Sequence, residues 1–357
     1  MTNQIPFERV YFTYKRFGGG ATMGCFQPLI ACRKLGIPAT AIDFKHIEHD
    51  SSKIKNSAIF LMKVLPSQRT IDRLKNNGNI LVAYPGDGAQ RGLINYFRNT
   101  SSLDGVIVGS TVFESILLDS KRKEKSTFLT RVIPANHAYF LDSSKFKEQR
   151  EASFKLYFGG SRNPSGPTQG DLGLSKDFDY AEGYFHSLKH MFNNMKYASS
   201  EELEKYALEV AAAGKCETLE GLIASEENPS KYSCHYAVRA PWVSNYHTQW
   251  NTKTGGKVST AAASGANIIT SLDPCVRELI DESYPYSIDT ETEDFKNNYK
   301  LICSDMVEYA RKTFNTKVWR DGLRMLEKVK ERTTTERITL DYIDFMKDIW
   351  ETNKGEV

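Results

Sequence analysis

The chain of 357 residues is long enough for two domains, since domains usually run about 100–200 residues. Hydrophobic residues make up 40% of it and charged residues 25%, as in ordinary globular proteins, and the net charge of +3 argues against a dedicated nucleic-acid-binding protein. No window approaches the ~20 apolar residues of a membrane span, and the first residues lack a signal-peptide pattern, so we expect a cytoplasmic protein.

The first part of the chain alternates apolar runs with helical stretches. Strands are predicted at residues 10–14, 39–43, 58–64, 80–83, 105–108 and 128–133. Helices are predicted at residues 24–35, 66–75 and 111–120, and Gly36 is placed to end the first of them. This alternation is typical of right-handed βαβ units and a parallel sheet.

A polar segment at 142–151 is expected to connect this part to a second one. Further strands are predicted at 154–158, 235–238 and 266–271, and helices at 185–194, 199–213, 295–314, 318–331 and 340–350, while 219–224 could be either. We therefore predict an α/β protein with two Rossmann-like domains, 1–141 and 152–315, followed by C-terminal helices at 316–357.

The stretch KTGGKVSTAAASGANIITSLD, residues 253–273, is a glycine turn, a helix of small residues, a second glycine and a buried strand. Free backbone N–H groups and Lys257 at the start of the helix would favour a bound phosphate. Lys253 lies four residues before Lys257, so the two ammonium groups could share one face. The alternative is a pair of solvent-exposed lysines.

Other candidate ligand contacts follow predicted strands, where doubly wound proteins bind their ligands. They are Gly19 and Gly20 after the first strand, Gly160 and Arg162 after the first strand of the second half, and Arg239 at a later strand end. Glycines allow a close backbone approach, and a guanidinium suits a diphosphate. A flexible turn and a surface arginine are the competing interpretations.

Two residues are candidates for a general base, Asp87 in a Pro-Gly-Asp-Gly turn and His137 at the end of the first half. A turn-forming aspartate and a buried structural histidine are equally reasonable alternatives. The six cysteines form no CxxC pair, and we expect neither a zinc site nor a catalytic metal.

Three stretches in the same order resemble the GT-B class of glycosyltransferases. Residues 132–137, VIPANH, are similar to the VIPNGVD junction that ends the first domain, and 156–162, LYFGGSR, to the strand and VGR loop that follow. Residues 260–269, TAAASGANII, are similar to the EAMAxGxPVV helix and strand. The resemblance implies two Rossmann-like domains facing across a cleft, with the acceptor on the first, the nucleotide-sugar donor on the second, and the C-terminal helices packed back on the first domain.

The resemblance also assigns roles by position. Arg162 and Lys257 would neutralise the donor diphosphate, Ser259 and Thr260 would contact phosphate or ribose, and Glu278 would bind a ribose or sugar hydroxyl. Many retaining members carry two glutamates where this chain has Thr252 and Thr260, so the nucleotide and the stereochemistry do not follow from the pattern.

The sequence thus predicts a metal-independent glycosyltransferase that moves a sugar from a nucleotide-sugar donor to a glycan or lipid-linked acceptor, as in polysaccharide biosynthesis. It requires no cofactor besides the donor, and no nucleic acid is expected as a partner, whereas contact with a membrane surface stays open. The alternatives are a nucleotide-sugar 2-epimerase on the same fold and a nucleotide-binding protein without catalysis.

Overall fold

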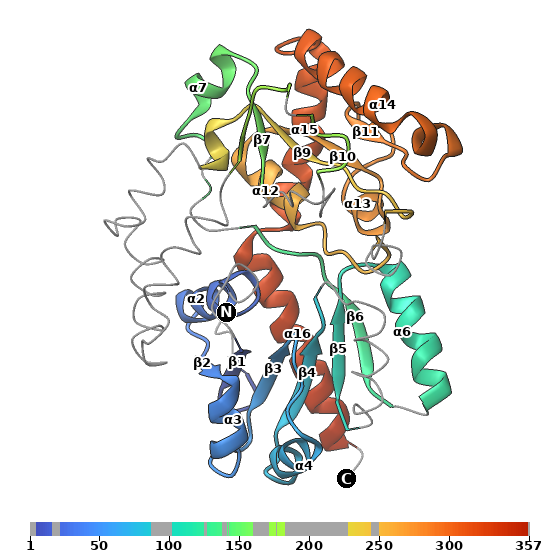
Figure 1. Cartoon of the computed structure of the whole chain (residues 1–357). Coiled ribbons are helices and arrows are strands. Elements are labelled where there is room, and N and C mark those ends of the chain that lie inside the picture. The colour runs from blue at the N-terminus through green and yellow to red at the C-terminus, as the bar shows by residue number, and fades with distance from the viewer. Residues whose placement is uncertain are drawn as a thin grey trace.

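The computed structural model describes residues 5–15, 22–86, 102–124, 127–137, 141, 143–159, 171–175, 177–182, 228–243 and 250–355. Helices predicted at 185–194 and 199–213, and the segment 219–224, lie outside these residues. The described part of the chain forms two α/β halves, one above the other in Figure 1.

The first half is built on a six-stranded sheet with the order β2-β1-β3-β4-β5-β6, in which all five pairings are parallel. Its strands are β1 (Val10–Tyr14), β2 (Ala39–Asp43), β3 (Ala58–Met62), β4 (Ile80–Tyr84), β5 (Gly105–Val108) and β6 (Leu129–Val132). Its helices are η1 (Thr22–Phe26), α2 (Gln27–Lys34), α3 (Phe44–Asp50), α4 (Gln68–Asn76) and α6 (Thr111–Glu124). The central strands β3 and β4 are buried at every position, as expected for a parallel sheet covered on both faces.

The second half has a five-stranded parallel sheet with the order β11-β10-β9-β7-β8. Its strands are β7 (Leu156–Phe158), β8 (Tyr180–Glu182), β9 (Cys234–Ala237), β10 (Asn267–Ser271) and β11 (Ser287–Ile288). Its helices are α7 (Lys147–Ala152), η2 (Pro229–Lys231), α12 (Gly256–Ser264), α13 (Pro274–Leu279), α14 (Glu293–Lys312) and α15 (Lys317–Arg332). Helices α12 and α13 lie on the side of this sheet that faces the first half (Figure 1).

The last two helices belong to different cores. Helix α15 buries Trp319, Leu326 and Val329 in the core of the second sheet. Helix α16 (Thr335–Gly355) runs back along the first sheet (Figure 1) and buries Tyr342 and Met346 among its strands. The predicted C-terminal unit at 316–357 is therefore divided between the two halves.

The segment 142–151, predicted to connect the two halves, contains the start of α7 at Lys147. Although the segment is polar, its Arg150 is buried and donates to the backbone carbonyl oxygens of Ser230, at 2.7 Å, and Ser143. The helix is thus attached to the second half through a buried guanidinium.

Both sheets reverse their strand order beside the first strand, between β1 and β3 and between β7 and β9. Ligands of doubly wound domains bind outside the carboxyl ends of the strands at such a point.

Every helix among the described residues is too short or too polar to cross a lipid bilayer.

Candidate functional site

The small-residue helix α12 forms as predicted, framed by two glycines. Gly255 at its N-cap has φ +67° and Gly265 at its C-cap has φ +69°, left-handed conformations in which a side chain would be strained. Because the turn at Gly255 separates Lys253 from the helix, the two lysines do not share a helical face, and that expectation is wrong. Lys253 is instead buried, with 3% of its surface exposed.

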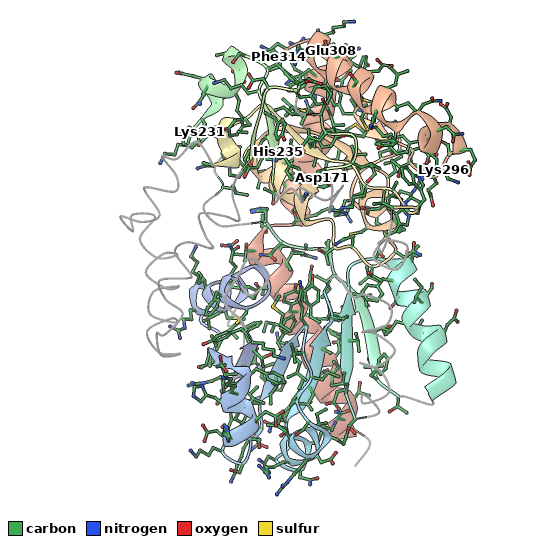
Figure 2. The ribbon with its side chains drawn as sticks, viewed as in Figure 1. Asp171, Lys231, His235, Lys296, Glu308 and Phe314 are labelled. Atoms are coloured by element: carbon green, nitrogen blue, oxygen red, sulfur yellow. The ribbon has the colours of Figure 1, made fainter. Side chains whose placement is uncertain are left out.

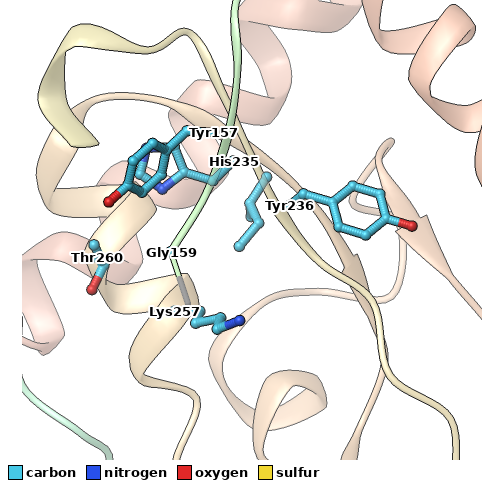
Figure 3. Close-up of a pocket in the computed structure, with 7 residues that line it drawn as sticks. Tyr157, Gly159, His235, Tyr236, Lys257 and Thr260 are labelled. Carbon is cyan, nitrogen blue, oxygen red and sulfur yellow. The ribbon is translucent and has the colours of Figure 1, made fainter. Parts of the chain in front are cut away.

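A pocket opens between the carboxyl ends of β7 and β9 and the first turns of α12 (Figure 3). It is lined by Tyr157, Gly159, His235, Tyr236, Lys257, Thr260 and Ile268. Its volume of about 20 Å³ holds a water molecule rather than a nucleotide. The pocket nevertheless lies at the topological switch point of the second sheet, where a ligand is expected.

Two polar side chains of α12 enter this pocket. The ammonium nitrogen of Lys257 lies 4.3 Å from the ring centroid of Phe158, the last residue of β7, within the range of a cation–π interaction. The Thr260 hydroxyl donates to the carbonyl oxygen of Gly256 at 2.8 Å. Its oxygen can still accept a hydrogen bond. The aromatic face thus holds a positive charge at the end of the strand.

His235 forms the inner wall of the pocket and lies inside the second half (Figure 2). Its Nε2 is 3.0 Å from the carbonyl oxygen of Pro229, to which it donates, and its ring packs on Tyr157 with centroids 5.1 Å apart. Burial lowers the pKa of His235 to about 4, and the positive charges of Arg150 and Lys257 act in the same direction. The imidazole is therefore neutral at neutral pH and does not compete with Lys257 for an anion.

Beyond the carboxyl ends of β9 and β10, Arg239 and Asp273 form a buried ion pair with Nη1 and Oδ2 2.7 Å apart. The Asp273 carboxylate also accepts from the backbone N–H of Val276, 3.0 Å away, at the start of α13. Burial raises the pKa of Asp273, while Arg239 and Lys253 act in the opposite direction. Asp273 is a site residue that the sequence pattern alone did not indicate, although an aspartate before Pro274 is the signal of a helix start.

Three predicted site residues make contacts between the two halves. The Ser259 hydroxyl donates to the carbonyl oxygen of Ala135 at 2.9 Å. The Glu278 carboxylate accepts from both the backbone N–H and the hydroxyl of Thr111, each at 2.7 Å. The backbone N–H of His137 donates to Thr333 at 3.0 Å, where the chain crosses back to the first half.

The structure therefore brings together Lys257 and Thr260 in the pocket, with Arg239 and Lys253 at the same edge of the sheet. Asp87, Gly19, Gly20, Gly160 and Arg162 lie outside the described residues. Within the described part of the chain, no three His, Cys, Asp or Glu side chains gather in a way that could hold a metal ion.

Solved structures with the same architecture cover almost the whole chain. A glycosyltransferase from Rickettsia africae matches 96% of this chain and 98% of its own at a TM-score of 0.61 and 11% identity. Sucrose-phosphate synthase from Thermosynechococcus elongatus matches 97% and 100% at a TM-score of 0.57 and 12% identity. HepE from Anabaena, solved in complex with UDP and glucose, matches 95% and 99% at a TM-score of 0.55 and 9% identity.

No protein-family model matches the sequence, and no curated protein matches it either. The structural matches show that the chain has the two-domain α/β fold of GT-B glycosyltransferases, which confirms the fold predicted from the sequence.

Proposed function

We propose that the protein is a glycosyltransferase that takes a sugar from a nucleotide-sugar donor. One observation carries the proposal: on a GT-B fold, the switch point of the second sheet holds a pocket to which the first turns of α12 contribute Lys257 and Thr260. Backbone N–H groups and a lysine at a helix N-terminus favour a phosphate. HepE supports UDP as the first nucleotide to test, since it was solved with UDP and glucose.

The chemistry suits these residues. Glycosyl transfer breaks a C–O bond to a leaving diphosphate, so the enzyme must stabilise the negative charge that grows there. Lys257 would do so at the pocket, and Arg239 and Lys253 lie at the same sheet edge. We propose that these cations, with Gly160 and Arg162, make a metal unnecessary.

The acceptor is proposed to be a glycan or lipid-linked sugar, and the reaction to take place in the cytoplasm. This acceptor would approach from the first half, in which Gly19 and Gly20 follow β1 in the sequence. Asp87 or His137 would serve as general base if the anomeric configuration is inverted. The Ser259 and Glu278 contacts between the halves would have to loosen before either side chain could reach the donor.

The proposal is tested first by thermal unfolding of the whole chain with UDP, GDP, ADP and CMP. A nucleotide at one hundred times its dissociation constant should stabilise the protein by about 2.7 kcal/mol. The nucleotide sugar that corresponds to the best nucleotide is then incubated with the enzyme, and we expect release of free nucleotide. Stabilisation by none of the four nucleotides would refute the proposal, and mass-neutral conversion of the sugar nucleotide would indicate an epimerase.

A further inference from the structure

The ion pair between Arg239 and Asp273 lies at the carboxyl edge of the second sheet. Strands β9 and β10 are neighbours in register, with Ala237 opposite Thr270, so both charged residues follow directly after the paired strands. The backbone N–H of Arg239 donates to the Ser271 hydroxyl at 3.1 Å. The pairing of β9 with β10 and the hydrogen bond to Ser271 together fix the backbone position of Arg239.

This pair is more deeply buried than a surface salt bridge. The Arg239 side chain is 11% exposed and that of Asp273 is 1% exposed. The Arg239 Nε is fully covered, and no described atom accepts its hydrogen bond. Buried ion pairs and unsatisfied donors are poor sources of stability, so stability alone does not account for this arrangement.

Asp273 is held from several sides at once. Val276 donates to one of its carboxylate oxygens and Arg239 to the other. Lys253, itself buried, lies close enough to favour the charged carboxylate. The carboxylate of Asp273 is thus hydrogen-bonded to Arg239 and to the start of α13 and is also close to the charge of Lys253.

We propose that Asp273 is a positioning residue that holds Arg239 in place for the donor diphosphate. The inference rests on the proposed function, because the anion it serves is the leaving group of that reaction. A fixed guanidinium needs no reorganisation when negative charge develops beside it, which is the source of electrostatic stabilisation in an active site.

The substitution Asp273→Asn distinguishes a positioning role of Asp273 from a direct effect of its negative charge on anion binding. Asparagine keeps the size of the side chain and is as good an N-cap as aspartate, so α13 can still begin at Pro274. Removing a negative charge next to two cations should by itself tighten the binding of an anion. If Asp273 acts through position, Arg239 becomes free to turn away, and binding of the anion weakens instead.

The experiment is calorimetric titration of the whole chain with UDP, or with GDP or ADP if one of them stabilises it more, well below the unfolding temperature. We expect Asp273→Asn to weaken binding at least tenfold. The control Asp281→Asn, in an exposed turn where the carboxylate accepts from Ser283 at 2.8 Å, should leave it unchanged. Asp273→Ser, which also caps a helix, replaces the asparagine variant if that variant does not fold.

The same titration in the Arg239→Ala background tests whether Asp273 works through Arg239. There, Asp273→Asn should cause no further loss, whereas a purely structural role would weaken binding in both backgrounds alike. Unchanged or tighter binding by Asp273→Asn alone would overturn the inference and leave the proposed function standing. A wild-type chain that binds none of the three diphosphates would overturn both.

Discussion

The buried histidine of the pocket predicts how stability depends on pH. The pKa of His235 is lowered by burial from 6.5 to about 4, so between these values the unfolded chain binds a proton that the folded chain does not. Stability must then fall as the pH falls through this window. With the two pKa values, the loss between pH 7.5 and pH 5 is about 2 kcal/mol.

The assay is urea denaturation at pH 7.5 and pH 5, for the wild type and for His235→Gln. Glutamine can reproduce the hydrogen bond from Nε2 to Pro229 but does not titrate. All other titrating groups are common to both proteins, so the difference between their two pH dependences isolates His235. The variant should lose about 2 kcal/mol less than the wild type on acidification. Equal losses in the two proteins would show that the imidazole is not buried in its neutral form.

Two further predictions concern the framework of the site. Gly36 and Gly265 both end helices at positive φ, +72° and +69°, but a Cβ on Gly36 would meet open space, whereas one on Gly265 would lie 2.8 Å from both the Cβ of Ser143 and the guanidinium of Arg150. Gly36→Ala should therefore lower the free energy of unfolding by about 1 kcal/mol, and Gly265→Ala should lower it by clearly more. Urea denaturation measures both losses, and equal losses would contradict the packing around Arg150. Glu278→Gln removes the negative charge at the N-terminus of α6 beside Thr111 and should lower the free energy of unfolding by about 0.3–1 kcal/mol, with the larger part of that loss at low salt. An unchanged stability would mean that this contact between the halves contributes nothing.

Much of the first sheet could be predicted from the sequence, because its strands are apolar runs bounded by turn residues. Strands β1, β2 and β5 have the predicted bounds, and β3 ends two residues early. Helix α3 was missed because only Ile47 of it is buried, so it shows no apolar stripe. A signal was present in Asp43, whose side chain caps that helix by accepting from Lys45. The edge strand β8 has three residues, too few to show an alternation.

Only part of the candidate site could be predicted from the sequence. The glycines around α12 define the helix locally, and so Lys257 and Thr260 could be placed at its start. The pairing of Arg239 with Asp273 joins residues 34 positions apart and depends on β9 and β10 being neighbours. Likewise, the contact of Glu278 with Thr111 depends on how the two halves pack, which no local pattern specifies.

The affinity of the Lys257→Met variant for UDP tests the proposed donor site most directly. Methionine retains an unbranched apolar side chain that can pack on Phe158 but lacks the ammonium group. Lys296→Met is the matched control, because Lys296 lies on α14 at the edge of the molecule (Figure 2) and pairs with Glu293 one helical turn earlier, with Nζ and Oε1 3.3 Å apart. A hydrogen bond to a charged group contributes about 1.5–3 kcal/mol, so Lys257→Met should weaken UDP binding by about 10- to 100-fold while Lys296→Met leaves it unchanged. Equal UDP affinities of the wild type and Lys257→Met would contradict a donor diphosphate at the start of α12.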